Sequence, residues 1–295
     1  MNNETYSHVH AGGTGFIEMP RGLIAIWGKE AEQFLDGLIT NDLKTLDDGS
    51  QMLAAFPNAQ GRLLAVVRVL RAGDRFYFET EDATRQKLFE YVFRFTYAGD
   101  FFAEDLSDNY RYFELMPATL EAPSKPEGII RFGHRRTTGL FVPGANGDEF
   151  REKMLSAGAR EIPDAVYETI RIENGTPKYG IDMDESTVVP ELGIEGLISY
   201  NKGCYIGQEI IARIHFRGHV AKQLTGLILD QPAAAGVELT SPDGKNAGRI
   251  TSVTYSPHLD KTIALGFVRY DHLADGTELK AGETTATVRA LPFVE

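Results

Sequence analysis

The sequence predicts an α+β fold that ends in a small all-β domain, because strands and helices follow each other differently in two parts of the chain. Between residues 51 and 116, strand-like runs surround one amphipathic helix, which is typical of a ferredoxin-like arrangement. These strands are predicted at 52–56, 62–70, 75–79, 100–106 and 111–116, and the helix at 82–95. From Leu224 onward only short strands and turns occur, at 224–229, 236–240, 247–255, 262–270, 277–280 and 284–291. This second pattern indicates a small β-barrel or β-sandwich.

The remaining elements are predicted from hydrophobic spacing and from glycine and proline. A buried strand at 22–28 leads into an amphipathic helix at 29–39, which ends at the turn residues 40–43. Asn41 in this turn is interpreted either as a polar lip on a pocket or as a local Asx turn. Residues 118–128 contain two prolines, directly follow a third at position 117, and are predicted as a linker. The later elements are predicted as strands at 129–132 and 139–142, helices at 148–158 and 163–172, and an irregular segment at 182–199.

Composition and charge restrict the class of protein. The chain has 295 residues, 42% of them hydrophobic and 24% charged, and is expected to bury about 75% of its unfolded surface in two or three units. The net charge of −12 argues against a general nucleic-acid binder. No run approaches the ~18 apolar residues of a membrane-spanning helix. Residues 1–13 have no apolar core and are expected to be frayed, so with a single cysteine we expect a cytoplasmic protein.

The most informative stretch is Lys202-Gly203-Cys204-Tyr205-Ile206-Gly207-Gln208-Glu209, which contains the only cysteine. The two glycines predict a tight turn that presents Cys204, and helical spacing resumes at Gln208. A neighbouring lysine and a nearby helix start favour the thiolate form of a cysteine. The alternative is that Cys204 is a small buried hydrophobic residue.

A basic strip extends from this motif into the next helix. Residues 202–223 contain four basic residues and only one acidic residue, Glu209; the basic residues are Lys202, Arg213, Arg217 and Lys222. The strip is interpreted as a site for a small anion or as a solvated basic face. His215 and His219 lie four residues apart, but Arg217 and Gly218 between them do not favour a regular helix, so no metal site is predicted.

These residues carry a resemblance to a known family. The 202–209 stretch resembles the signature Lys-Gly-Cys-Tyr-x-Gly-Gln-Glu of the YgfZ-type folate-binding proteins, which help to maintain iron–sulfur enzymes. That family is related to the aminomethyltransferase, or T-protein, of the glycine cleavage system. Further similar blocks run along nearly the whole chain, at 37–42, 58–62, 171–175, 179–182, 248–252 and 263–266.

The resemblance implies a fold and a ligand. The fold would be a three-domain cloverleaf of the aminomethyltransferase folate-binding type, with tetrahydrofolate in a central hole. Its domains would be a folate-binding domain at 1–48 and 118–222, a ferredoxin-like domain at 49–117, and a C-terminal β-barrel at 223–295. Glu173 is the candidate carboxylate for the pterin, because a carboxylate can accept two hydrogen bonds from an amino group and a ring N–H. The other candidate folate contacts are Tyr179, Asn41, Arg62, Lys202, Arg213 and Arg217.

One departure from the family pattern bears on catalysis. Aminomethyltransferases carry an Asp-Asp pair soon after the turn that corresponds to 58–61, and one Asp assists attack by folate. The matching residues here are Ala65 and Val66. Neither side chain can exchange a proton. T-protein chemistry is therefore not expected, and Cys204 is the candidate reactive residue.

Three functions follow as hypotheses. The first is a tetrahydrofolate-binding accessory protein that supports assembly or repair of iron–sulfur proteins through Cys204; one cysteine cannot hold a cluster alone, so a partner would share it. The second is a folate-dependent aminomethyltransferase or demethylase that acts on a small amine and uses Glu173 or Asp182 for acid–base chemistry. The third is a protein-binding module that uses no folate. Equilibrium titration with tetrahydrofolate separates the third from the other two.

Overall fold

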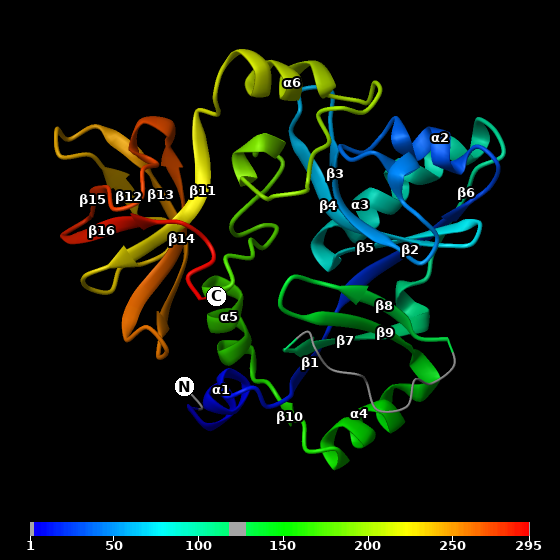
Figure 1. The fold of residues 1–295 in the computed structure, drawn as a ribbon, viewed down its shortest axis with the longest axis horizontal. Coiled ribbons are helices and arrows are strands. Elements are labelled where there is room, and N and C mark those ends of the chain that lie inside the picture. The colour runs from blue at the N-terminus through cyan, green and yellow to red at the C-terminus, as the bar shows by residue number, and fades with distance from the viewer. Residues whose placement is uncertain (1–2, 118–127, 295) are drawn as a thin grey trace. The chain divides into compact units, whose positions relative to one another are not determined.

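The structure is a computed structural model that describes residues 3–117 and 128–294 (Figure 1). The chain divides into two compact units. The first comprises Met1–Pro57, Leu64–Val166 and Gly196–Ile206, and the second Asn58–Leu63, Tyr167–Glu195 and Gly207–Glu295. Each unit therefore collects segments that are far apart in the sequence.

The first unit contains two five-stranded sheets. One has the strand order β3-β4-β5-β2-β6, and the other β10-β1-β7-β9-β8. The strands of the first sheet are β2 (Arg21–Trp27), β3 (Gln51–Pro57), β4 (Leu63–Ala72), β5 (Arg75–Glu81) and β6 (Phe102–Asp105). Those of the second are β1 (Gly15–Met19), β7 (Tyr110–Met116), β8 (Ile130–Gly133), β9 (Thr138–Pro143) and β10 (Arg160–Glu161). The helices are α1 (Asn3–His10), α2 (Ala31–Asp36), α3 (Asp82–Phe93) and α4 (Gly147–Ser156).

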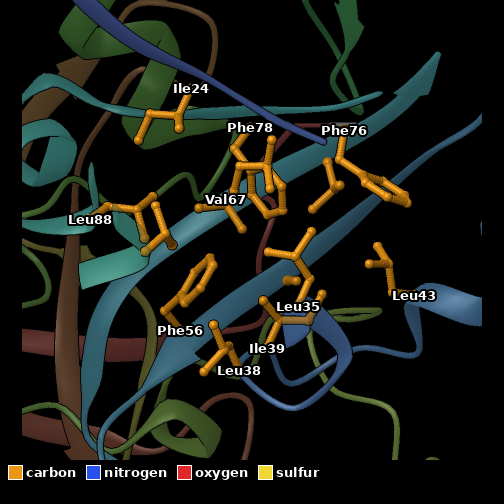
Figure 2. Packing of buried hydrophobic residues seen from close by; sticks show 14 of the residues in the cluster. Ile24, Leu35, Leu38, Ile39, Leu43, Phe56, Val67, Phe76, Phe78 and Leu88 are labelled. Carbon is orange, nitrogen blue, oxygen red and sulfur yellow. The ribbon is translucent and has the colours of Figure 1, made fainter. Parts of the chain in front are cut away.

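Alternation of side chains along the strands arranges these sheets and helices in layers. Val67 on β4 and Phe78 on β5 belong to a core with α2 and α3 (Figure 2). Tyr77, which precedes Phe78 on β5, packs in a different cluster with Tyr112 of β7, between the two sheets. Phe113, next to Tyr112, faces a third cluster with α4. The unit thus has helices on one side, two sheets in the middle and α4 on the other side.

The second unit contains a closed barrel with the strand order β11-β14-β13-β12-β15-β16. Its strands are β11 (Lys222–Leu229), β12 (Glu238–Thr240), β13 (Asn246–Ser256), β14 (Lys261–Arg269), β15 (Glu278–Ala281) and β16 (Thr284–Arg289). Leu227 lies in the barrel core, whereas Leu224 packs outside it with Ile172 from the end of α5 (Asp164–Glu173). The helix α6 (Gln208–Arg217) precedes the barrel. The α+β fold and the C-terminal barrel predicted from the sequence are confirmed.

Some elements differ from the sequence-based prediction. Residues 3–10 form α1, with Tyr6 only 3% exposed, so the expectation of a frayed terminus was wrong. The strand β1 was not predicted, although Phe16 is fully buried in it. The helix predicted at 29–39 is shorter, because regular α-helix covers only Ala31–Asp36. The predicted linker at 118–128 lies, except for Gly128, outside the described residues.

The sheets also combine strands from different parts of the chain. The strand β2 lies between β5 and β6, in the same sheet as residues 51–81. The strand β7 pairs instead with β1 and β9 of the other sheet. The division into three domains at residues 48, 117 and 222 stays a prediction.

Candidate functional site

Residues 196–206 of the first unit are anchored to the turn that follows α2. The Thr40 hydroxyl donates to the Leu197 carbonyl at 2.6 Å, and the Ser199 amide donates to the Thr40 carbonyl at 3.0 Å. Asn41 donates both amide hydrogens, to the carbonyls of Leu53 and Gly196 at 2.8 Å each. These bonds join the motif at 37–42 to residues 196–199, which lie just before the motif at 202–209. Since both of its donors are used, Asn41 has a structural role in this geometry.

The buried side chain of Lys202 also connects this segment to the end of α2 and the turn after it. Its side chain is 0% exposed, and its ammonium donates to the carbonyls of Asp36, Ile39 and Asn41 at 2.7, 3.0 and 2.6 Å. The Asp36 carboxylate lies 3.0 Å from the same nitrogen. Burial lowers the pKa of Lys202, and the hydrogen bond and charge of Asp36 oppose that shift. An ammonium has three hydrogens, so Lys202 has none left for an anionic ligand or a thiolate.

Cys204 lies at the exposed part of this anchored segment. Both Gly203 and Cys204 are exposed, whereas Tyr205 is buried and the Ile206 amide donates to the Gly37 carbonyl at 3.1 Å. Burial raises the pKa of Tyr205 to about 12. The sequence left open a presented thiol and a buried hydrophobic residue, and this geometry agrees with the presented thiol. An exposed thiol on a fixed backbone is accessible to a macromolecular partner.

Glu173, the candidate pterin carboxylate, lies in the second unit at the end of α5. Its side chain is buried, with the residue 1% exposed, and its Oε1 accepts a hydrogen bond from the Ser256 hydroxyl at 2.5 Å. Its backbone carbonyl accepts from the Phe293 amide at 2.9 Å. A bidentate pair with a pterin therefore requires that the Glu173 carboxylate share or release Ser256.

Asp182 binds four donors of the second unit. Its Oδ2 accepts from Arg171 Nη1 at 2.7 Å and from the Lys178 amide at 3.0 Å. Its Oδ1 accepts from the hydroxyls of Thr251 at 2.5 Å and Ser252 at 2.7 Å. Consecutive residues of a regular strand face opposite sides, but a bulge between Ile250 and Ser252 lets both hydroxyls reach one carboxylate. This arrangement is that of a structural carboxylate.

The other predicted folate contacts are also in the second unit. Arg62 is exposed, and its Nη1 donates to the Ser186 carbonyl at 3.0 Å. Arg213 is exposed on α6, and Tyr179 is half-buried and forms a parallel bridge with Met183. Arg217 ends α6, but its side chain lies outside what the structure describes. The structure thus places these residues and Glu173 in one unit, and Cys204, Lys202 and Asn41 in the other.

Ala65 and Val66, the two residues at which the sequence departs from the pattern that the resemblance predicts, lie on β4. Ala65 is 1% exposed and belongs to the core shown in Figure 2, whereas Val66 is half-buried on the opposite face of the strand. Its carbonyl accepts a hydrogen bond from the Thr80 hydroxyl at 3.2 Å. The side chains at both positions are aliphatic, so this part of β4 supplies no proton donor or acceptor from a side chain.

A charged cluster that the sequence did not predict lies between the two sheets of the first unit. Glu79 is 2% exposed, and its Oε1 accepts from Arg21 Nε at 3.0 Å and from the Tyr112 hydroxyl at 3.1 Å. His134 Nε2 lies 3.2 Å from Glu79 Oε2, and its Nδ1 lies 3.3 Å from Arg68 Nη2. Burial would raise the pKa of Glu79, but the charges of His134 and Arg21 outweigh it, and that pKa lies well below its ordinary value.

Among residues 3–117 and 128–294, no three His, Cys, Asp or Glu side chains gather as metal ligands. None of the helices in these described ranges is long and apolar enough to cross a membrane.

Comparison with known proteins gives matches in sequence. The model of the glycine cleavage T-protein C-terminal barrel domain matches residues 222–295. The iron-sulfur cluster assembly factor IBA57 homolog of Mycosarcoma maydis, a mitochondrial protein, is 26% identical over 70% of this chain and 55% of its own length. The aminomethyltransferase of Thermosynechococcus vestitus is 34% identical over 52% of this chain and 43% of its own. These alignments span about half the length of each relative.

A solved structure extends the comparison to the fold. The aminomethyltransferase T of the glycine cleavage system from Bartonella henselae matches with a TM-score of 0.85. The match covers 96% of this chain and 86% of that protein, at 21% sequence identity. The two chains therefore share a fold.

Proposed function

This chain belongs to the glycine cleavage T-protein family, and from that premise we propose that it is a YgfZ-type accessory protein for iron–sulfur enzymes that binds tetrahydrofolate. The observation that carries the proposal is the presentation of Cys204, an exposed thiol on a segment anchored on both sides. A relative named as an iron–sulfur cluster assembly factor supports the same role. The proposed compartment is the cytoplasm.

Tetrahydrofolate would supply a reduced pterin and a carboxylate tail, and the residues of the second unit differ in how they suit it. Arg62 and Arg213 are exposed cations that can pair with tail carboxylates. Glu173 offers a carboxylate for the pterin, although Ser256 already donates to one of its oxygens. Lys202 and Asn41 are not proposed as ligands, because their donors are satisfied within the first unit. Tyr179 is proposed as a ring contact.

Tetrahydrofolate affinity tests the folate half of the proposal. We expect Glu173→Gln to weaken binding about tenfold to a hundredfold, since hydrogen bonds to a charged group are worth about 1.5–3 kcal/mol. Ser256→Ala is the matched control, because it removes the hydroxyl that donates to Glu173 and keeps the carboxylate. Equal affinity of the wild type and Glu173→Gln would exclude Glu173 from the site, and no binding by the wild type would leave the folate-free binding module.

Replacement of the thiol tests the other half. Cys204→Ala should bind tetrahydrofolate as the wild type does and should fail to support cluster-dependent enzymes in cells that lack the wild-type protein. Cys204→Ser is the isosteric control, which keeps a polar group and removes sulfur chemistry. Full support by Cys204→Ala would remove the thiol from the mechanism.

The alternative function is folate-dependent aminomethyl transfer or demethylation, which the relative named aminomethyltransferase favours. It requires an acid–base group in place of Ala65 and Val66. Asp182 is poorly suited, because four donors hold it. Conversion of tetrahydrofolate to a methylene derivative with a small amine donor would support this alternative, and Glu173 would then be its candidate group.

A further inference from the structure

The ammonium of Lys202 is a charge that the fold encloses completely. Its side chain is 0% exposed, and three backbone carbonyls and the Asp36 carboxylate surround the nitrogen at 2.6–3.0 Å. Enclosing a charge is unfavourable unless its partners compensate well, and removal of one partner is then strongly destabilising. A methionine of similar length would avoid the charge but could not satisfy the carbonyls. The ammonium therefore has a specific task at this position.

The ammonium binds backbone carbonyls of this chain and not a ligand. The three carbonyls belong to Asp36, Ile39 and Asn41, which lie within six consecutive residues after and at the end of α2. In the sequence, Lys202 is followed directly by the exposed Gly203 and Cys204. A Cβ added to Gly203 would meet no atom within 4 Å, so the space into which a side chain at this position would extend is open.

Two backbone hydrogen bonds of the segment lie on either side of the thiol. Before it, the Ser199 amide donates to the Thr40 carbonyl at 3.0 Å, and after it the Ile206 amide donates to the Gly37 carbonyl at 3.1 Å. Lys202 is a side-chain anchor between these two backbone bonds. Its ammonium also lies 5.3 Å from the centre of the Tyr205 ring, so it contacts the residue on the other side of Cys204.

We propose that Lys202, with Asp36 as its counter-ion, is a positioning residue for Cys204. It fixes the backbone that carries the thiol, and it does not act as a cation toward the sulfur, because its three hydrogens are directed to carbonyls. This inference rests on the proposed function for the purpose of the thiol, but the anchoring itself can be tested without it.

The test compares Lys202→Met with Lys44→Met. Lys44 pairs with the other oxygen of Asp36 at 3.5 Å but is 64% exposed, so both variants lose one positive charge beside the same carboxylate. In Lys202→Met we expect the Ile206 amide to exchange its hydrogen about tenfold faster or more, and support of cluster-dependent enzymes to fall to the level of Cys204→Ala. Tetrahydrofolate affinity should stay within about threefold of the wild type. Lys44→Met should match the wild type in all three measurements.

Lys202→Arg separates positioning from charge. It keeps the positive charge, but its planar fork cannot direct hydrogens to the same three carbonyls. Positioning therefore predicts loss of support in Lys202→Arg, whereas action of the charge on the thiol predicts retention. Should Lys202→Met fail to fold, Asp36→Asn keeps the ammonium and should accelerate exchange at Ile206 by a smaller factor.

Three outcomes would overturn the inference: unchanged exchange at Ile206 in Lys202→Met, equal effects of Lys202→Met and Lys44→Met, or full support by Lys202→Arg. Failure of the proposed function is a different result. In that case Cys204→Ala itself supports the enzymes, while hydrogen exchange still reports whether Lys202 holds the segment.

Discussion

Asp182 offers a sharp test of whether a buried carboxylate in this protein is structural or catalytic. We expect Asp182→Ala to lower the free energy of unfolding of the second unit by about 3–5 kcal/mol, the usual cost of removing one partner of a buried ion pair. The perturbation is large because Arg171 is 4% exposed and loses its contact at 2.7 Å. Glu168, 34% exposed, still pairs with Arg171 at 3.0 Å and limits the loss.

The expected loss of unfolding free energy has one contribution from the charge of Asp182 and another from its hydrogen bonds. In Asp182→Asn, the amide can donate to the hydroxyls of Thr251 and Ser252, because a hydroxyl can accept as well as donate. Its carbonyl oxygen can still accept from Arg171 and from the Lys178 amide. Asparagine therefore removes the charge and keeps most hydrogen bonds, and we expect a loss of about 2 kcal/mol. In the pair Arg171→Leu and Asp182→Leu, the double variant should lose at least about 2 kcal/mol less than the sum of the single variants.

Urea unfolding, monitored by hydrogen exchange of amides in β13 and β14, measures this loss of stability in the second unit. With a denaturant dependence of about 2 kcal/mol per M, Asp182→Ala should lower the midpoint by roughly 1.5–2.5 M. Trp27, the only tryptophan, lies in the first unit, so its fluorescence reports that unit separately. The reasoning is refuted if Asp182→Asn unfolds like the wild type, and loss of turnover at unchanged stability would instead make Asp182 an acid–base group.

Two further predictions concern the charged cluster and the backbone. The folded pKa of Glu79 lies below its unfolded value of about 4.3, so its ionised form stabilises the protein above about pH 5 and this contribution is lost as the pH falls further. Glu79→Gln should therefore unfold more easily at neutral pH, by about 3 kcal/mol, and should show a weaker dependence on acid; parallel acid-unfolding curves for both proteins would contradict this. Gly207 has φ of 80°, and an added Cβ would lie 2.4 Å from the Asn58 carbonyl oxygen, so Gly207→Ala should lose roughly 3 kcal/mol or more. Gly236 has φ of 87° and no atom within 4 Å of an added Cβ, so Gly236→Ala should lose only about 1 kcal/mol of unfolding free energy. Thermal unfolding of both variants measures the difference, and equal losses would show that the close approach to Asn58 is unimportant.

Several elements could be predicted because their signal is local. The strand β5 and the helix α3 are visible from side-chain spacing, and the barrel strands from their turns. The strand β1 was missed because it has only five residues and follows a run of glycines. The short α2 was overpredicted, because the apolar spacing continues through Leu38 and Ile39 while the backbone leaves the helix after Asp36.

The partners of the site residues could not be predicted from spacing. Asp36 comes just before the block 37–42, but nothing local relates it to Lys202, which lies 166 residues later. Ser256 gave no signal as the partner of Glu173, and neither did the cluster around Glu79, whose members come from different strands of two sheets. Lys202 was therefore interpreted as part of a basic strip that binds a small anion or faces solvent, because only the charges of its neighbours in the sequence could be considered.

The sequence by itself determined the sites of possible chemistry. It contains one thiol, between two glycines, and the aliphatic Ala65 and Val66 where the resemblance predicts carboxylates, and no folding can change which groups are present. Tertiary structure alone decided which polar groups remain available. Hydrogen bonds that reach across up to 166 residues for Lys202 and up to 70 for Asp182 satisfy these two groups, and Cys204 stays exposed. The physical reason is that buried donors and charges must find partners wherever the fold brings them together.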